Sequence, residues 1–206
     1  LVDKKAIIFG GNRGIGLAIK QVLADAGCDV EVASRSSGCD VGNWTDVTEA
    51  INSAERKLGR LDYVINCAGM LNKMRLNLQD QSEIEKMVRI NFFGALNVAK
   101  GSFNSLKNSK GMLLQFSSSS YTRGRSEYTP YSASKAAVVN LTQGLADEWQ
   151  SDNIRVNCIV PGRTSTDMRR ENFSKEDKSQ LFSPFEVALK AYKLLGSSRT
   201  GAIVRI

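Results

Sequence analysis

Tyr131 and Lys135 stand four residues apart in the segment YSASK. Residues at this spacing share one face of a helix, so a phenol and an ammonium can act on the same group. A free phenol has a pKa of about 10 and is a poor acid or base at neutral pH. A neighbouring ammonium favours the phenolate and is expected to lower the pKa of Tyr131. The pair predicts proton transfer, and the alternative is a surface tyrosine beside a solvated lysine.

The absence of histidine limits the remaining chemistry of the 206 residues. Histidine-dependent catalytic triads and histidine-ligated zinc are excluded. The four cysteines form no Cys-x-x-Cys pair, which predicts reduced thiols, a cytoplasmic location and no metal site. No apolar run approaches the roughly 20 residues of a membrane span and no leader opens the sequence, so no membrane association is expected.

A glycine-rich turn, GGNRGIG, follows the first apolar run. Between a strand and a helix, such glycines let the backbone approach a pyrophosphate, whose charge the helix N-terminus favours. A purely structural turn is the alternative. The residues that we expect to bind a dinucleotide here are Gly10, Asn12, Arg13, Gly14, Ile15 and Gly16.

The end of the second apolar run bears on the choice between NAD and NADP. A carboxylate there would bind the ribose 2′-hydroxyl and repel a 2′-phosphate. The chain instead has Ser34, Arg35 and Ser36, with Arg13 in the glycine turn. Guanidiniums and hydroxyls favour a 2′-phosphate, so the predicted cofactor is NADPH or NADP⁺. The alternative is that both arginines face solvent.

Short apolar runs alternate with amphipathic stretches along the chain. This pattern predicts an α/β fold, a Rossmann-like doubly wound parallel sheet with helices on both faces, in a single domain over residues 1–206. The predicted strands are 5–10, 29–34, 61–66, 111–117, 154–160 and 201–205, with a very short one at 38–41. The predicted helices are 14–26, 46–58, 82–106, 131–150 and 184–195.

Local signals support some of these boundaries. Asp46 with Glu49 resembles a capping box, and Ser183 with Glu186 forms another, followed by Gly196 as a helix stop. Residues 163–181 are polar and weakly periodic, which predicts a mobile flap with one or two short helices.

Together these motifs resemble the short-chain dehydrogenase/reductase family over essentially the whole chain. The further motifs that carry the resemblance are Asn66-Cys67-Ala68-Gly69, Asn91, Ser117-Ser118 and Pro161-Gly162. The resemblance implies an NADP-dependent oxidoreductase that transfers hydride to or from a carbonyl carbon. It implies a catalytic tetrad of Asn91, Ser118, Tyr131 and Lys135. Ser118 lies at the family's usual interval of 13 positions before Tyr131, and Ser117 is the second choice.

The resemblance also implies a role for each residue. Ser118 would bind the carbonyl oxygen, Tyr131 would donate the proton, Lys135 would hold the nicotinamide ribose, and Asn91 would hold a water. Further cofactor contacts are implied for Asp40, Val41, Asn66, Ala68, Gly69, Pro161, Gly162, Thr164 and Thr166. The sequence departs from the family at Phe9, at Cys67 and after Arg35, where most relatives have a full helix before the position of Asp40.

Arginines and hydroxyls are frequent in the segments expected to face the substrate. Arg123, Arg125, Arg163, Arg169 and Arg170 motivate a small anionic substrate, since a steroid or acyl pocket would be mostly apolar. The predicted substrate-binding residues are Ser118, Ser120, Arg123, Arg125 and Arg163. The motifs also resemble the reductase domain of bifunctional CDP-ribitol synthases, which implies reduction of ribulose 5-phosphate to ribitol 5-phosphate for capsule or wall polymers, beside a cytidylyltransferase.

Other functions remain open. A 3-oxoacyl-carrier-protein reductase is the enzymatic alternative, and a non-catalytic NADPH-binding module is another. The net charge of +7 fits phosphorylated ligands or a solvated basic surface. No motif for nucleic-acid binding is present. The family resemblance implies a homodimer or homotetramer that pairs through residues 82–106 and 131–150.

Overall fold

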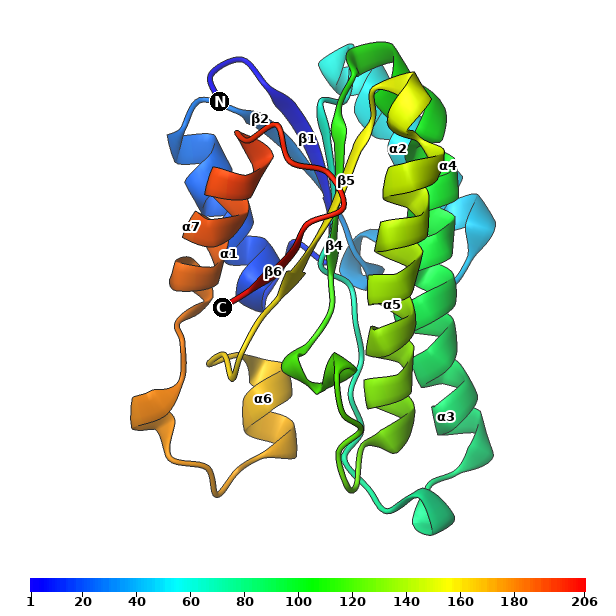
Figure 1. The fold of residues 1–206 in the computed structure, drawn as a ribbon, viewed down its shortest axis with the longest axis vertical. Helices are drawn as coiled ribbons and strands as arrows, with labels where there is room; N and C mark the ends of the chain where they lie inside the picture. The colour runs from blue at the N-terminus through cyan, green and yellow to red at the C-terminus, as the bar shows by residue number, and fades with distance from the viewer.

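The computed structural model describes residues 1–206 as a sheet between two layers of helices (Figure 1). The strands are β1 (Lys5–Phe9), β2 (Asp29–Ala33), β3 (Tyr63–Asn66), β4 (Met112–Phe116), β5 (Arg155–Val160) and β6 (Ile203–Arg205). Every neighbouring pair is parallel, and the order is β2-β1-β3-β4-β5-β6. This confirms the predicted doubly wound sheet. The strand order reverses beside β1, and the carboxyl edge at such a point is where α/β sheets bind ligands.

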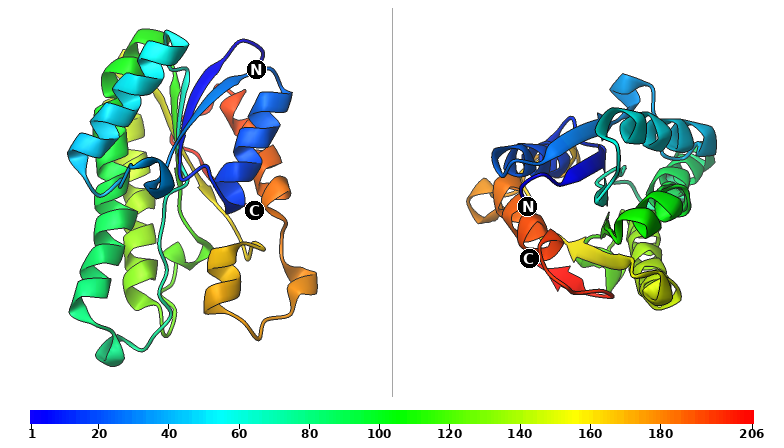
Figure 2. Two further views of the ribbon diagram at one scale, coloured as in Figure 1. Left: turned by 180° about the vertical axis from the view of Figure 1, so that it is seen from behind. Right: turned by 90° about the horizontal axis from the view of Figure 1, so that it is seen from above.

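Helices cover both faces of this sheet (Figures 1 and 2). One face carries α1 (Gly14–Asp25) and α7 (Pro184–Leu195), and the other carries α2 (Trp44–Leu58), α4 (Gly94–Ser109) and α5 (Thr129–Glu148). Successive strand residues point to opposite faces, so Ile8 joins the first core cluster and Ile7 the second. Burial on both sides explains why the central strands β1 and β4 are almost uninterrupted apolar runs, whereas the edge strand β2 alternates acidic and apolar residues.

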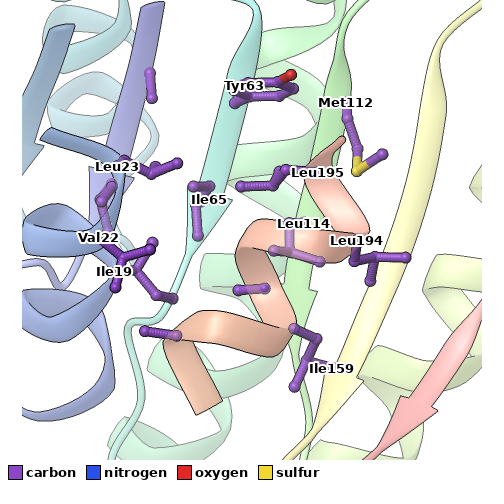
Figure 3. Close-up of a cluster of buried hydrophobic side chains, with 14 of the residues drawn as sticks. Ile19, Val22, Leu23, Tyr63, Ile65, Met112, Leu114, Ile159, Leu194 and Leu195 are labelled. Atoms are coloured by element: carbon purple, nitrogen blue, oxygen red, sulfur yellow. The ribbon is translucent and has the colours of Figure 1, made fainter. Parts of the chain in front are cut away.

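The core beneath α1 and α7 holds these helices at a fixed position over the strands. Ile19 and Leu23 of α1 and Leu194 and Leu195 of α7 belong to one buried cluster with Ile65 and Leu114 of the sheet (Figure 3). Because α1 begins at the glycine turn, this packing also fixes the turn against the carboxyl end of β1.

The predicted flap crosses the carboxyl edge of the sheet (Figure 1). It contains α6 (Asp167–Asn172) and a 3₁₀ turn, Lys178–Gln180, so the expectation of one or two short helices is confirmed. A bridge between Thr164 and Phe182 joins the two ends of the flap at its base. The flap therefore leaves the sheet and returns to it at one place.

Two predictions at the start of α2 are wrong. Residues 38–41 form no strand; a 3₁₀ turn, Arg35–Ser37, leads through turns into α2. The helix begins at Trp44 rather than Asp46, because Asn43 accepts hydrogen bonds from two backbone N–H groups of the first turn. The carboxylate of Asp46 instead accepts a hydrogen bond from the N–H of Asp40 (2.9 Å). Asp46 and Glu49 therefore do not form the predicted capping box. No full helix lies between Arg35 and Asp40, as the spacing predicts.

The helix predicted over residues 82–106 is confirmed as an unbroken helical stretch that is slightly longer at each end. It consists of α3 (Gln81–Val88), a π-helical turn, Arg89–Phe93, and α4, which follow one another without a gap. Helix α5 begins two residues before Tyr131, at Thr129, with a proline in its first turn. The capping box at Ser183 is confirmed, since Glu186 N donates to Ser183 Oγ (3.2 Å) and Ser183 N donates to the Glu186 carboxylate (2.7 Å). No helix in the chain combines the length and apolar character that crossing a bilayer requires.

Candidate active site

A cavity of about 650 Å³ opens at the carboxyl edge of the sheet. The glycine turn forms one wall, residues 33–36 and 39–41 form a second, and Tyr131 and Lys135 close the inner end. Its size lies in the range of small-molecule and cofactor sites. The cavity thus brings together segments that are more than 100 residues apart in the sequence.

The glycine turn is shaped to admit a ligand close to its backbone. A side chain at Gly16 would place Cβ 2.3 Å from the carbonyl oxygen of Gly10, and one at Gly10 would lie 2.9 Å from the N–H nitrogen of Ala68. Gly10 and Gly14 have φ of +76° and +55°, which favours glycine. No side chain caps the first turn of α1 at Arg13, and the turn contains no acidic residue. A pyrophosphate fits this helix N-terminus.

The outer end of the cavity carries hydroxyls and guanidiniums. Asn12 Nδ2 donates to the Oγ atoms of Ser34 and Ser36, at 2.6 Å each, and the side chains of Arg13 and Arg35 are exposed at its rim. Asp40 is the first carboxylate that follows Ser36 in the chain, and it already pairs with Arg89 (2.9 Å). These groups fit the 2′-phosphate of NADP, and no acidic residue follows β2 to repel it.

At the inner end, Tyr131 and Lys135 lie on the first turns of α5. Lys135 is 5% exposed and donates from Nζ to the carbonyl oxygen of Phe116 (3.0 Å). The hydroxyl of Ser118 lies near the phenol of Tyr131 and acts on its pKa. Ser117, the second choice, turns its hydroxyl to the carbonyl oxygen of Lys135 (2.7 Å). The geometry therefore favours Ser118 as the partner of the phenol, although Ser117 is the serine that lines the cavity.

The electrostatics of this pair differ from the expectation. Burial raises the pKa of Tyr131, while the hydroxyl of Ser118 and the charge of Arg169 oppose that rise. Burial also lowers the pKa of Lys135, to about 8. Among the residues of the chain, the cost of burying a phenolate exceeds the effect of nearby cations, so Lys135 alone does not lower the phenol pKa. A lowering by Lys135 together with the positive ring of an oxidised nicotinamide stays a prediction. The Lys135 Nζ lies 5.9 Å from the phenol ring centre and is directed to Phe116.

Asn91 lies on the π-helical turn and holds the loop that follows β3. Its Oδ1 accepts from Met70 N (2.8 Å), and its Nδ2 donates to Met70 O (2.9 Å) and to Ser134 Oγ (3.1 Å). A Cβ at Gly69 would approach both Asn91 Oδ1 and Lys135 Nζ at 3.4 Å. Asn91 thus uses its amide to hold the backbone of Met70 and the hydroxyl of Ser134, and its role in binding water stays a prediction.

Comparison with known proteins shows the family of this chain. A family model described as short chain dehydrogenase matches residues 36–177. The chain belongs to the short-chain dehydrogenase family. It is accordingly an oxidoreductase that acts on CH–OH or C=O groups, in a family that uses NAD(P)H.

Three relatives place this dehydrogenase more closely. It is 37% identical, over 204 residues, to the bifunctional ribulose 5-phosphate reductase/CDP-ribitol pyrophosphorylase of Haemophilus influenzae, covering 99% of this chain and 43% of that protein. The chain thus spans less than half the length of that relative. It is 33% identical over 179 residues to the 3-oxoacyl-[acyl-carrier-protein] reductase of Mycobacterium tuberculosis, with coverage of 82% and 72%. The solved structure of ElxO with NADP bound has a TM-score of 0.90 at 25% identity, with coverage of 98% and 96%.

Most of the predicted cofactor-binding residues of the dehydrogenase line the cavity. Beyond the glycine turn, Tyr131 and Lys135, they are Ser34, Arg35, Asp40, Val41, Ala68, Gly69, Pro161 and Thr166. Asn66, Gly162 and Thr164 do not line it. Asn66 donates to Gln115 (3.0 Å) and accepts from Ala68 N (3.2 Å), so it supports the loop from behind. Thr164 is buried and donates to the carbonyl oxygen of Gly162 (3.1 Å).

None of the predicted substrate-binding residues lines the cavity of the dehydrogenase. Ser120 is buried and donates to Ser118 Oγ (3.2 Å), while Arg123 and Arg125 are exposed. Arg163 pairs with Glu176 (3.3 Å). Three further lining residues, Ser36, Cys67 and Ser117, belong to motifs that the sequence singled out. The other lining residues carried no signal in the sequence, namely Ala33, Cys39, Met70, Ile90, Phe116, Asp167 and Met168.

Proposed function

We propose that this dehydrogenase reduces a carbonyl group with NADPH, and that its substrate is ribulose 5-phosphate, giving ribitol 5-phosphate. The observation that carries the proposal is the placement of Tyr131 and Lys135 at the inner end of a cavity whose other end presents Arg13 and Arg35. A proton donor and a dinucleotide cradle thus lie at opposite ends of one continuous space.

The residues divide the reaction among them. When bound, the reduced nicotinamide supplies the hydride. Ser118 binds the substrate carbonyl oxygen, and Tyr131 transfers its phenolic proton to that oxygen. The buried ammonium of Lys135 holds the nicotinamide ribose, and Asn91 positions the backbone of Met70 beside it. The raised pKa of Tyr131 keeps the phenol protonated at neutral pH, as a proton donor requires.

The preference for NADPH over NADH is supported by the outer end of the cavity. Ser34 and Ser36 offer hydroxyls beside Asn12, and two guanidiniums are free to approach a 2′-phosphate. The NADP-bound structure of ElxO supports the same choice, since that fold covers 98% of this chain.

The sugar phosphate is supported by the Haemophilus relative, whose name includes ribulose 5-phosphate reductase and which matches 99% of this chain. We propose a cytidylyltransferase as the functional companion, with the product entering capsule or wall polymers in the cytoplasm. We also propose pairing of two or four copies through α3–α4 and α5. A 3-oxoacyl-carrier-protein reductase is the second candidate, supported by the 33% identity to the mycobacterial enzyme.

An assay of cofactor oxidation separates these candidates. NADPH and NADH are each tested with ribulose 5-phosphate and with an acetoacetyl thioester. The expected result is a higher kcat/KM for NADPH with ribulose 5-phosphate. Tyr131→Phe should lower kcat at least about 100-fold, because it removes the proton donor. Tyr192→Phe, on α7 in the core of the opposite layer, is the matched control and should keep wild-type activity.

Faster turnover of the thioester would replace the proposed substrate by the second candidate. Unchanged kcat in Tyr131→Phe would refute the assignment of the proton donor itself.

A further inference from the structure

We propose that Arg169 binds the phosphate of the substrate, and that Glu176 occupies this anion site until the phosphate displaces it. The proposal concerns the substrate end of the same cavity and rests on the proposed function for the identity of the anion, a phosphate monoester. The site lies in the flap, on α6 and the segment after it.

The carboxylate of Glu176 is bound as an anionic ligand would be. Arg169 donates to both of its oxygens, from Nε at 2.6 Å and from Nη2 at 2.5 Å, and Arg163 Nη1 donates at 3.3 Å. A guanidinium offers this two-pronged geometry to carboxylates and phosphates alike. The hydrogen bond from Arg169 holds the pKa of Glu176 below its usual range, so the carboxylate stays ionised at neutral pH.

Arg169 is connected to Tyr131, at the inner end of the cavity, by a series of contacts between aromatic side chains. Its guanidinium lies 3.7 Å from the ring centre of Phe173, whose ring is perpendicular to Tyr128 at 5.7 Å. Tyr128 in turn packs edge-on against Tyr131 at 6.2 Å. Arg169 is also the cation whose charge acts on the pKa of Tyr131. Asp167 and Met168, the two residues before it, line the cavity, so the turn of α6 that carries Arg169 borders this space although Arg169 itself does not line it.

The surroundings distinguish this pair from ordinary surface ion pairs. The side chains of Arg169 and Glu176 are 22% and 14% exposed, whereas Arg170 of the same helix is 52% exposed and pairs with Asp167. An ion pair shielded from water is weakened less by solvent and salt than an exposed one. Two guanidiniums share one carboxylate, which leaves an excess positive charge that attracts a second anion.

Glu176 can leave without unfolding a helix. It follows α6 and precedes the 3₁₀ turn at Lys178, in a segment held by a single turn bond from its N–H to Phe173 O (3.1 Å). The base of α6 stays docked independently, because Asn172 accepts from Lys73 N (2.8 Å) and donates to Leu71 O (3.3 Å). Arg169 would therefore remain in place while a phosphate replaced the carboxylate.

The exchange would make the flap selective. A phosphorylated ketose supplies the anion that replaces Glu176. A neutral carbonyl compound supplies none, so Glu176 stays bound to Arg169. The selectivity then comes from the competing carboxylate as well as from the attraction of the guanidinium for phosphate.

The test measures binding of inorganic phosphate to the NADP⁺-saturated protein by calorimetry, so that the phosphate-binding groups of the cofactor site are already filled. Glu176→Gln removes the competing charge and should lower the Kd of phosphate about tenfold. Arg169→Gln should raise it at least about tenfold. Arg170→Gln removes the same charge from the neighbouring position and should leave it unchanged. Arg169→Lys keeps the positive charge but loses the two-pronged donor geometry of the guanidinium, so its Kd for phosphate should lie between those of the wild type and Arg169→Gln. It replaces Arg169→Gln if that variant does not fold.

The proposal requires the Kd of phosphate to change in opposite directions in Glu176→Gln and Arg169→Gln. If Glu176 only ties the flap in place, breaking the pair from either side has the same consequence, and equal shifts or none would overturn the proposal. The KM for ribulose 5-phosphate should follow the Kd of phosphate in each variant, with a smaller change in kcat. Opposite shifts in phosphate binding without turnover of ribulose 5-phosphate would support the anion site and refute the proposed substrate. Turnover of ribulose 5-phosphate together with equal shifts in the Kd of phosphate would support the proposed substrate and refute the anion site.

Discussion

The buried ammonium of Lys135 should make the protein less stable at neutral pH than it would be without this charge. Lys135 is 5% exposed, carries no carboxylate partner among the ion pairs of the chain, and has its pKa lowered from 10.5 to about 8 by burial. One pKa unit corresponds to about 1.4 kcal/mol, so the charged form costs the fold about 3 kcal/mol at pH 7.

The direction of the pH dependence follows from the two pKa values. Below pH 8 both the folded and the unfolded chain bind the proton, and the full cost is present. Between pH 8 and 10.5 the unfolded chain binds more protons than the folded one, so the stability contributed by this residue rises with pH. The cost is nearly absent above pH 10.5. Integrated from pH 7 to pH 10, this single group changes the free energy of unfolding by about 2 kcal/mol.

Lys135→Met removes the charge and keeps the shape of the side chain. It also removes the hydrogen bond to Phe116 O, at a cost of about 1 kcal/mol. We therefore expect the variant to be more stable than the wild type by about 2 kcal/mol at pH 7, and about equal to it at pH 10. The gain in stability should accompany a loss of activity, because Lys135 is proposed to hold the nicotinamide ribose.

Urea denaturation of both proteins without cofactor, over this pH range and under reducing conditions, measures the difference. Bound cofactor would add its own contribution to stability and is left out. The buried cysteines titrate in both proteins, so their effect largely cancels in the difference. A difference that does not depend on pH, or a variant less stable than the wild type at pH 7, would refute the reasoning.

Two glycine substitutions should have opposite effects. Gly16→Ala places Cβ 2.3 Å from Gly10 O, which must shift the glycine turn; we expect a loss of about 1–3 kcal/mol by urea denaturation and at least about tenfold weaker NADPH binding by fluorescence titration. Gly144→Ala, at an exposed position of α5 with no atom within 4 Å of the new Cβ, should raise stability by about 1 kcal/mol with NADPH binding unchanged. Equal behaviour of the two variants would show that the close approach at Gly16 is not required.

The elements that sequence patterns located well are those whose burial is uniform. Strand β4 was expected at 111–117 and spans Met112–Phe116, because a parallel strand covered on both faces must be apolar throughout. The glycine turn and the Tyr131–Lys135 pair were also found, because their geometry depends on residues within one or two turns of each other. Such local constraints are visible without the tertiary fold.

The errors occur where a local pattern has two structural solutions. Cys39 and Val41 alternate as a short strand would, yet Val41 instead packs against α4, where a Cβ at Gly94 would lie 2.6 Å from its side chain. The long helix around Asn91 was expected correctly, but its π-helical turn leaves the apolar periodicity almost unchanged and so gives no signal in the sequence. In both places tertiary packing determines a local detail that the sequence alone does not show.

Charged side chains show the same limit most clearly. A count of arginines predicts an anionic substrate but cannot tell which guanidinium is available, because that depends on partners such as Glu176, which is joined to Arg169 across an irregular segment. The pKa of Tyr131 depends on burial as much as on charge. Lys135 was expected to lower it, but the same burial that raises the phenol pKa also removes affinity for the proton from Lys135. Low dielectric therefore favours the neutral form of both groups, and for Tyr131 the neutral form is the protonated phenol that a proton donor requires.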